Sequence, residues 1–240
     1  IVPEVSEIGP CGLKFNVASY DTALSESVAV DQVIQITDRS NDATNTLGCV
    51  ILGAARSAVS MPTAIISGLR GFPQMSPIST SPVLDDKSQY KYFARTIPND
   101  DGTSVPLIAR LNSGGATAGG GGGKDESQSW GVDFLAVLYI DDSYGAGFAQ
   151  GIVAAAQQMA PGMQVKLFAI SNGADDASIQ RVISSMAESQ YMYFFGILYP
   201  DAFVDRIMTA AVEAGIAGTG LHTWLFSDSV GGGVTGRNFT

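Results

Sequence analysis

The sequence predicts an α/β protein whose parallel sheets are covered by helices. Short apolar runs of strand length alternate along the chain with longer segments that carry a helical stripe of apolar residues. The strand segments are apolar on both faces, which is typical of parallel sheets that lie between helical layers. Hydrophobic residues make up 45% of the chain and charged residues 15%, so the apolar content is sufficient for a sizeable core.

The first half of the chain gives the weaker version of this pattern. Strands are expected at residues 13–18, 49–53, 73–77 and 92–96, and helices at residues 25–37 and 58–69. Pro62 fits the second helix only in its first turn, because proline cannot donate the N–H that a helix interior needs. Pro98 stops the last of these strands.

The second half repeats the alternation more clearly. Strands are expected at residues 133–140, 165–170, 191–198 and 223–226, and helices at residues 147–159, 176–188 and 202–214. Asp175 or Asp176 can cap the start of the middle helix, and Gly215 is suited to end the third one. A further helix is expected to end near Asn112.

A glycine-rich run interrupts this order. Residues 113–123 include five consecutive glycines and are followed by Lys124, Asp125 and Glu126. A phosphate-binding loop instead places particular glycines before a lysine and a serine or threonine that enter a helix. We therefore expect a flexible surface insertion here rather than a nucleotide site.

The charge balance excludes nucleic acid as an expected partner. Acidic residues outnumber basic ones by 23 to 13, which gives a formal net charge of −10. Such a chain repels phosphate backbones, and no basic cluster offsets the repulsion. No apolar run reaches about 18 residues, and residues 1–7 lack the pattern of a signal peptide. Membrane association is therefore expected only through parts of a protein outside this segment.

The sequence offers no set of residues for catalysis or for a metal. His222 is the single histidine, and no serine in a Gly-x-Ser-x-Gly turn accompanies it. Cys11 and Cys49 do not supply the clustered ligands that zinc requires. Paired acids such as Asp141 and Asp142 are expected in solvated turns or helix caps, because sequence neighbours tend to point apart. We predict that the protein is not an enzyme and binds no cofactor or metal.

One aromatic residue is a candidate for ligand contact from its position alone. An aromatic run occupies the expected strand at residues 191–198, and most of it is expected in the core. Tyr199 follows the carboxyl end of that strand, which is the edge where parallel sheets bind ligands. We therefore count Tyr199 among the candidate ligand-binding residues.

Several segments occur in the same order as in one family of ligand-binding domains. They are Val50–Ser60, Phe72–Pro77 with Ser79–Ser81, Tyr92–Asp100, Trp130 and Asp142–Gly145. Together they resemble the receptor ligand-binding region of the type I periplasmic-binding-protein fold. This family includes ectodomains of class C G-protein-coupled receptors, natriuretic peptide receptors, amino-terminal domains of ionotropic glutamate receptors, and bacterial branched-chain amino-acid binding proteins.

The resemblance implies two doubly wound lobes with parallel sheets. It assigns residues 1–97 to a partial lobe one, residues 98–228 to lobe two, and residues 229–240 to the start of a return segment. By the standard of the family lobe one is incomplete, because a first strand and helix are expected before Leu13. A homodimer through lobe one is a further expectation.

The function implied by the resemblance is that of an extracellular or cell-surface sensor. We expect a signalling receptor domain that closes on a small molecule between its lobes, and an amino acid or a similar zwitterion is the favoured ligand. A solute-binding protein of a transporter is one alternative. A structural or interaction module with a vestigial cleft is another.

Five candidate residues come from alignment with the family's motifs. Ser57 and Thr80 would offer hydroxyls from lobe one, and Ser57 would start a helix whose N-terminus favours a carboxylate. In lobe two, Asp100, Tyr144 and Asp228 match positions that hold the ammonium group and backbone of an amino acid. Two carboxylates and a tyrosine ring suit a small cation.

Two residues near these positions depart from the amino-acid receptors of the family. Ile78 stands where those receptors often have a polar residue, and Arg56 adds a cation beside the expected carboxylate site. Both departures bear on which ligand the chain accepts.

The pairing of the two cysteines has two alternatives. Cys11 and Cys49 each precede a predicted strand of lobe one, and the resemblance implies that a third strand separates these two, a spacing of roughly 10 Å. A disulfide needs α-carbons within about 7 Å. The sequence is therefore compatible with a disulfide closed by the loops ahead of the strands and with two free thiols.

Overall fold

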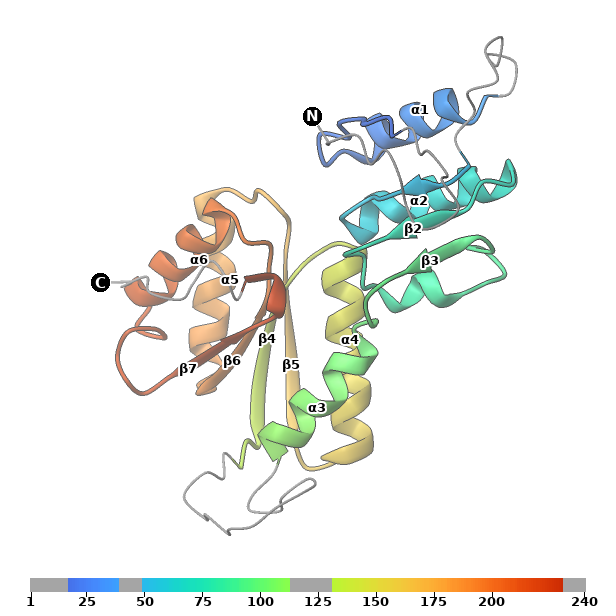
Figure 1. Cartoon of the computed structure of the whole chain (residues 1–240). Helices are drawn as coiled ribbons and strands as arrows, with labels where there is room; N and C mark the ends of the chain where they lie inside the picture. The colour runs from blue at the N-terminus through green and yellow to red at the C-terminus, as the bar shows by residue number, and fades with distance from the viewer. Residues whose placement is uncertain (1–16, 39–48, 113–130, 231–240) are drawn as a thin grey trace, which may run out of the picture. The chain divides into compact units, whose positions relative to one another are not determined.

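The computed structural model describes residues 17–38, 49–112 and 131–230 of the chain (Figure 1). Along these residues β-strands alternate with α-helices, and the strands form two parallel sheets. The predicted α/β class with parallel sheets is confirmed.

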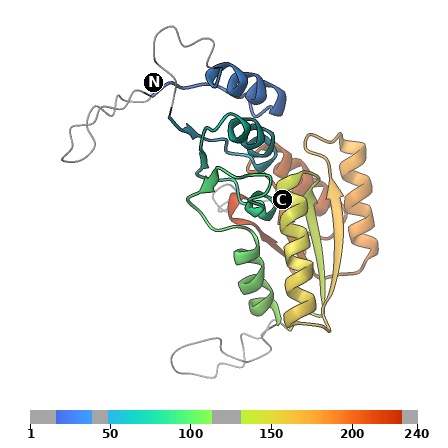
Figure 2. The same ribbon diagram turned by 90° about the vertical axis from the view of Figure 1, so that its right-hand side faces the viewer.

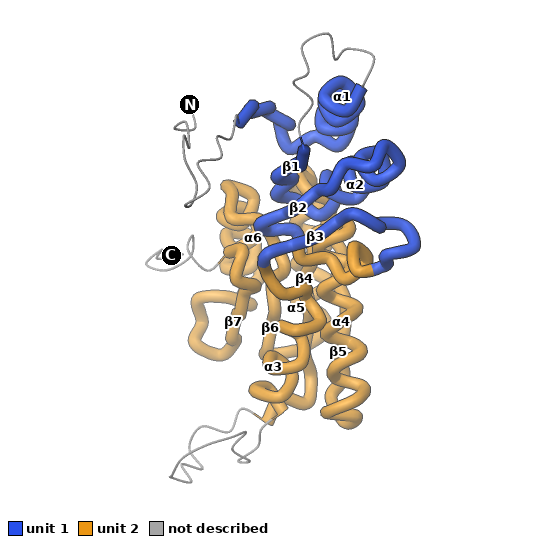
Figure 3. The backbone as a smooth tube through the Cα atoms, turned by 45° about the vertical axis from the view of Figure 1, so that its right-hand side comes forward, with its two compact units in different colours: residues 1–79, 86–96 blue, residues 80–85, 97–240 orange. Residues whose placement is uncertain are grey.

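The described residues divide into two compact units, which Figure 3 shows in different colours. Unit 1 holds the described residues up to Ser79 together with Asp86–Thr96. Unit 2 holds Thr80–Asp85 together with the described residues from Ile97 onward. The chain therefore passes between the units three times within this stretch.

Unit 1 consists of a three-stranded parallel sheet and two helices. Its elements are α1 (Glu26–Ile36), β1 (Ile51–Leu52), α2 (Ser57–Leu69), β2 (Gln74–Ser76) and β3 (Phe93–Arg95). The strands pair in the order β1-β2-β3. The strand expected at residues 13–18 lies largely outside the described residues, and its last two positions, 17 and 18, are not in a strand.

Helix α2 continues through Pro62, which was expected to fit only in a first turn. Proline at this position removes one N–H from the helix ladder and has a cost. The same helix buries Val59, Thr63 and Ala64 within unit 1. Tertiary packing of this buried face therefore outweighs the local preference of proline.

Unit 2 consists of a four-stranded parallel sheet between helical layers. Its elements are the 3₁₀ helix η2 (Pro82–Asp85), α3 (Asp101–Asn112), β4 (Phe134–Ile140), α4 (Ser143–Met159), β5 (Gln164–Ile170), α5 (Asp176–Glu188), β6 (Tyr193–Ile197), α6 (Ala202–Glu213) and β7 (Thr223–Phe226). The strands lie in the order β5-β4-β6-β7, and every neighbouring pair is parallel.

Both faces of the unit 2 sheet are covered, as the apolar strands predicted. Helices α3 and α4 lie on one face, and α5 and α6 lie on the other (Figures 1 and 2). Alternate residues of β4 enter the two cores: Leu135 and Val137 pack under α3 and α4, whereas Ala136 and Leu138 pack under α5 and α6. All four side chains are fully buried.

Aspartates begin three of the helices in unit 2. The side chain of Asp142 accepts hydrogen bonds from the N–H groups of Tyr144 and Gly145, that of Asp175 from Ser178, and that of Asp201 from Phe203. The cap of α5 is therefore Asp175 rather than Asp176. Helix α4 begins at Ser143, four residues before the expected start, because Asp142 provides a cap that outweighs the glycines of the first turns.

Some expectations fall outside the described residues. The glycine-rich run at residues 113–123 and Cys11 are among them, and the return segment is described only up to Val230. Cys49 is exposed, and since Cys11 is not described, both the disulfide and the two free thiols stay predictions. In the described ranges we find no helix with both the length and the apolar character needed to cross a membrane.

Candidate functional site

The sheet of unit 2 has a topological switch point between β4 and β6. From β4 the chain runs through α4 to β5 on one side, and then through α5 to β6 on the other side of β4. In open parallel sheets the crevice beyond the carboxyl ends of two such strands is where ligands bind. The residues that follow β4 and β6 are therefore candidates for ligand contact.

Two tyrosines lie together at this switch point. Tyr144 follows β4, in the first turn of α4, and Tyr199 follows β6. Their rings are stacked, with centroids 5.6 Å apart and an interplanar angle of 29°. Tyr144 is buried and makes an edge contact with Phe148, whereas Tyr199 is half-buried. The solvent-facing member of the stack is therefore Tyr199.

Protein groups hold both tyrosine hydroxyls. The hydroxyl of Tyr199 donates to Oδ2 of Asp142 over 2.6 Å. The hydroxyl of Tyr144 lies 3.1 Å from the Oγ of Ser227 and 3.0 Å from that of Ser229. Ser229 in turn donates to the carbonyl of Leu198 over 2.8 Å. These bonds fix the positions of both rings and leave the ring of the half-buried Tyr199 as the aromatic surface available to a ligand.

Burial raises the pKa of Tyr144 to about 12. Its hydrogen bonds with Ser227 and Ser229 act in the opposite direction, and the negative charges of Asp100 and Asp228 raise the pKa further. At neutral pH Tyr144 is therefore a neutral hydrogen-bond donor. Both carboxylates are therefore near enough to Tyr144 to act on its hydroxyl, although less strongly than burial does.

The two acids differ in exposure. Asp100 is 3% exposed and stands directly before α3, where its carbonyl accepts a hydrogen bond from the Ser104 hydroxyl over 2.9 Å. Asp228 follows β7 and is exposed, and its Oδ1 accepts from the Ser229 N–H over 3.0 Å. A ligand that approaches from solvent therefore meets Asp228 before Asp100.

Thr80 lies in unit 2, although it was expected to act from lobe one. Its carbonyl accepts a hydrogen bond from the N–H of Asp100 over 3.0 Å, and the residues that follow it form η2 against α4. This backbone bond and the packing of η2 are the reason that the segment groups with unit 2. The half-buried Thr80 thus belongs to the same unit as Asp100 and Tyr144.

Ser57 is the first residue of α2 in unit 1, one position before the expected start of the helix. It is 2% exposed, and the N-cap position is taken by Arg56, which makes no side-chain cap bond. The turn that precedes the helix consists of residues 53–56. Ile78 is 58% exposed. The position at which the amino-acid receptors of the family often have a polar residue therefore lies at the surface.

Three residues that bond to the tyrosine hydroxyls were not predicted as partners from the sequence: Asp142, Ser227 and Ser229. Asp142 was expected only as a turn or cap, yet its second carboxylate oxygen accepts from Tyr199. Ser227 and Ser229 flank Asp228 immediately after β7, and that placement after a parallel strand was the available signal. Among the described residues, no group of three His, Cys, Asp or Glu side chains is arranged to hold a metal.

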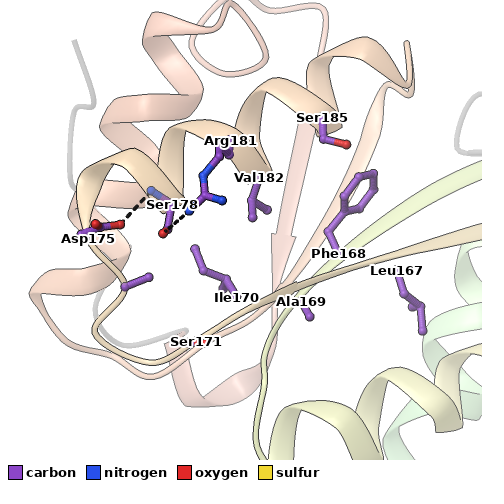
Figure 4. A pocket seen from close by; sticks show the side chains of 11 residues that line it. Leu167, Phe168, Ala169, Ile170, Ser171, Asp175, Ser178, Arg181, Val182 and Ser185 are labelled. Carbon is purple, nitrogen blue, oxygen red and sulfur yellow. Dashed lines mark hydrogen bonds between the residues drawn. The ribbon is translucent and has the colours of Figure 1, made fainter.

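A separate hollow of about 610 Å³ lies between β5 and α5, away from these residues (Figure 4). Its polar groups bond to one another: Arg181 donates to Ser178 over 2.7 Å, and the Ser178 N–H donates to Asp175 over 2.9 Å. The remaining lining is mostly the apolar side chains of β5 and Val182. The switch point, and not this hollow, gathers charged and aromatic groups suited to a ligand.

Comparison with known proteins agrees with the motifs. Residues 9–107 match the receptor family ligand binding region. Metabotropic glutamate receptor 6 of Oryctolagus cuniculus is 23% identical in an alignment that covers 75% of this chain and 19% of the receptor. Metabotropic glutamate receptor 4 of Mus musculus is 23% identical, over 75% of this chain and 18% of the receptor. The metabotropic glutamate receptor of Drosophila melanogaster is 30% identical, over 42% of this chain and 12% of the receptor.

These matches confirm the resemblance that the ordered segments predicted. The family model that residues 9–107 match describes a receptor ligand-binding region, and the named relatives are receptors rather than enzymes. The chain spans about a fifth of the length of the curated relatives it matches.

Proposed function

We propose that this chain is the ligand-binding domain of a cell-surface receptor and that its ligand is a small amino acid or a similar zwitterion. The observation that carries the proposal is the cluster at the switch point of unit 2. Tyr144 and Tyr199 are stacked there, and the carboxylates of Asp100 and Asp228 are near enough to raise the pKa of Tyr144. An amino acid brings one ammonium group, which suits carboxylates and an aromatic face together.

The ammonium end of the ligand is assigned to unit 2. Asp228 is the accessible carboxylate, and Asp100 is a buried one that contributes to the raised pKa of Tyr144. The ring hydroxyls are bonded to protein groups, so the half-buried Tyr199 offers its ring rather than its hydroxyl. Cation–π contact at such a ring contributes about 0.5–2 kcal/mol, depending on its desolvation.

The carboxylate end is assigned to the N-terminus of α2 in unit 1. Backbone N–H groups at a helix N-terminus and the helix dipole favour an anion, and Ser57 adds a hydroxyl at the first helical position. Thr80 is the second hydroxyl of the set. In the family that the chain resembles the ligand is bound between the two lobes, and we propose the same for this chain.

The names of the relatives favour a receptor over a transporter's solute-binding protein. They also make L-glutamate the first compound to test, because the relatives that match are called metabotropic glutamate receptors. An extracellular location of this domain and a homodimer through unit 1 are parts of the same proposal.

The test is calorimetry of the purified chain against the twenty common amino acids, beginning with L-glutamate. We expect saturable binding of at least one of them, and a loss of about tenfold or more in affinity for Asp228→Asn, since a charge-assisted contact to the ligand is removed. Leu221→Ala, at an exposed side chain before β7, is the control and should bind like the parent. Absence of binding by the parent, or binding that ignores Asp100→Asn and Asp228→Asn, would sink the proposal.

A further inference from the structure

The turn before α2 is held from its inner side by three buried serines. The Oγ atoms of Ser76, Ser60 and Ser79 lie 2.6, 3.1 and 3.2 Å from the carbonyl oxygen of Ala54. The Oγ of Ser79 also lies 3.1 Å from the carbonyl oxygen of Ala55. All three serines are at most 1% exposed, which is unusual for this residue type.

The protons of these hydroxyls suffice for both carbonyl groups. Ser76 already accepts the N–H of Ser79 over 2.9 Å, so its own proton is free for Ala54. A carbonyl oxygen accepts two hydrogen bonds and a hydroxyl donates one. Ser60 donates either to Ala54 over 3.1 Å or to the Oγ of Ser79 over 2.9 Å, and Ser79 donates to Ala55. In both cases each carbonyl has a donor, and no hydroxyl proton of the trio lacks an acceptor.

This arrangement fixes the direction of two backbone N–H groups. The peptide units that follow Ala54 and Ala55 are trans, so in each of them the N–H points opposite to the C=O. Both carbonyls point inward, toward the buried serines. The N–H groups of Ala55 and Arg56 therefore point outward at the start of α2, where Ala55 is exposed.

We infer that Ser60, Ser76 and Ser79 are positioning residues for the carboxylate end of the ligand. They do not touch the ligand; they hold the turn so that the outward N–H groups of Ala55 and Arg56 are ordered before binding. A turn that is already ordered loses less conformational freedom on binding, which increases affinity. The inference rests on the proposed function, and it adds to it the groups that set the geometry of the anion-binding turn.

A matched control lies in the same helix. Ser67 is also 1% exposed, but its hydroxyl is 3.3 Å from both the Gln74 Oε1 and the Ala64 carbonyl and does not contact the turn. Ser67→Ala therefore removes a buried hydroxyl of unit 1 without removing a donor to Ala54 or Ala55.

The test compares Ser76→Ala with Ser67→Ala in the whole chain by two measurements. Without ligand, nuclear magnetic resonance follows the carbonyl carbon of Ala54 and the hydrogen exchange of the Ala55 and Arg56 amides. With L-glutamate, or whichever of the twenty amino acids the parent binds, calorimetry gives the affinity. For Ser76→Ala we expect a shifted Ala54 carbonyl resonance, faster exchange and an affinity about three- to tenfold weaker, while Ser67→Ala resembles the parent.

An unchanged Ala54 resonance and unchanged exchange in Ser76→Ala would overturn the inference, whatever the ligand result. Equal losses of affinity in Ser76→Ala and Ser67→Ala would also overturn it, because both would then act through general stability. If the parent binds no amino acid although the serine variants loosen the turn, the proposed function fails and the ligand role of the serines fails with it. Should Ser76→Ala not fold, Ser79→Ala provides the same comparison with the loss of the Ala55 contact.

Discussion

The hydroxyl of Tyr199 donates a 2.6 Å hydrogen bond to one carboxylate oxygen of Asp142, while the other oxygen caps helix α4. A single side chain thus connects the end of β6 to the start of α4 across the switch point of the sheet. Tyr144, in the turn that Asp142 caps, stacks on the ring of Tyr199. The positions of both rings therefore depend on Asp142.

Tyr199→Phe should lower the free energy of unfolding by about 1–2 kcal/mol, because it removes a hydrogen bond to a carboxylate but keeps the ring. Urea unfolding monitored by circular dichroism measures the loss. Tyr139→Phe is the control, since Tyr139 is half-buried and none of the described residues bonds to its hydroxyl. Equal effects of the two substitutions would show that the bond to Asp142 does not stabilise unit 2.

Asp142→Ala should be more destabilising than Asp201→Ala. Asp201 accepts one backbone N–H, from Phe203, at the start of α6, and loss of such a cap costs about 1 kcal/mol. Asp142 accepts two backbone N–H groups and the Tyr199 hydroxyl, so a loss of about 2–3 kcal/mol is expected. Thermal or urea unfolding of both variants decides the order, and a larger loss for Asp201→Ala would contradict the role given to Asp142.

Stability should fall at high pH through Tyr144. Burial raises its pKa from 10.0 to about 12 in the folded chain, so the unfolded chain releases the phenolic proton first. The contribution is fully present below pH 10 and is lost as the pH rises toward about 12, by up to roughly 3 kcal/mol. The difference in unfolding free energy between the parent and Tyr144→Phe, measured from pH 8 to about 12, isolates this effect.

The comparison with Tyr144→Phe is needed because burial also raises the pKa of a second tyrosine, Tyr90. The pH dependence of the parent alone therefore contains both tyrosines. If Tyr144→Phe loses stability between pH 10 and about 12 as steeply as the parent, Tyr144 does not titrate as described.

The fold of unit 2 was largely predictable from its sequence because its strands are long apolar runs. β4 is buried on both faces, and such a strand leaves a clear signal in the order of residues. The strands of unit 1 span only two or three residues, so their pattern is weaker. Pro62 inside α2 was not predictable, because packing of the buried face of that helix decides the matter.

The sequence predicted the site residues that match the family's motifs, but not the hydrogen bonds that join them to other residues. Tyr144 and Asp228 follow strands and match known motifs, and Tyr199 follows a strand end. The bonds of Asp142 to Tyr199 and of Ser229 to Leu198 join residues 57 and 31 positions apart, and no local pattern carries such pairings. The placement of Thr80 in unit 2 likewise depends on a backbone bond with Asp100 that sequence spacing does not reveal.

A homodimer through unit 1 should depend on the outer face of α2. Ile65 and Leu69 lie one helical turn apart on this helix and are 38% and 84% exposed. We expect the parent to dimerise in sedimentation equilibrium and Leu69→Glu to weaken the dimer by about tenfold or more, because a charge enters an apolar contact. Leu221→Glu, at a leucine of unit 2 that is 71% exposed, is the matched control. A parent that stays monomeric, or equal weakening by both substitutions, would contradict this interface.

Gly145→Ala should disturb the switch point more than a glycine substitution normally does. A Cβ added at Gly145 would overlap the backbone carbonyl of Ile140, the last residue of β4, so the first turn of α4 would have to move. Tyr144 and the cap bonds of Asp142 lie in that turn, and we expect a loss of about 2–4 kcal/mol in unfolding free energy. Gly68→Ala, inside α2 with nothing within 4 Å of the added Cβ, should instead stabilise the chain by about 0.5–1 kcal/mol.

The two glycine variants also separate stability from ligand binding. Under conditions where both are fully folded, Gly145→Ala should weaken the binding of the amino acid that the parent accepts, because the Tyr144 ring is displaced from Tyr199. Gly68→Ala should leave that affinity unchanged, since it alters neither the tyrosine pair nor the turn before α2. Calorimetry at a temperature well below both unfolding midpoints makes the comparison. Unchanged affinity in a folded Gly145→Ala variant would show that the position of Tyr144 is not part of recognition.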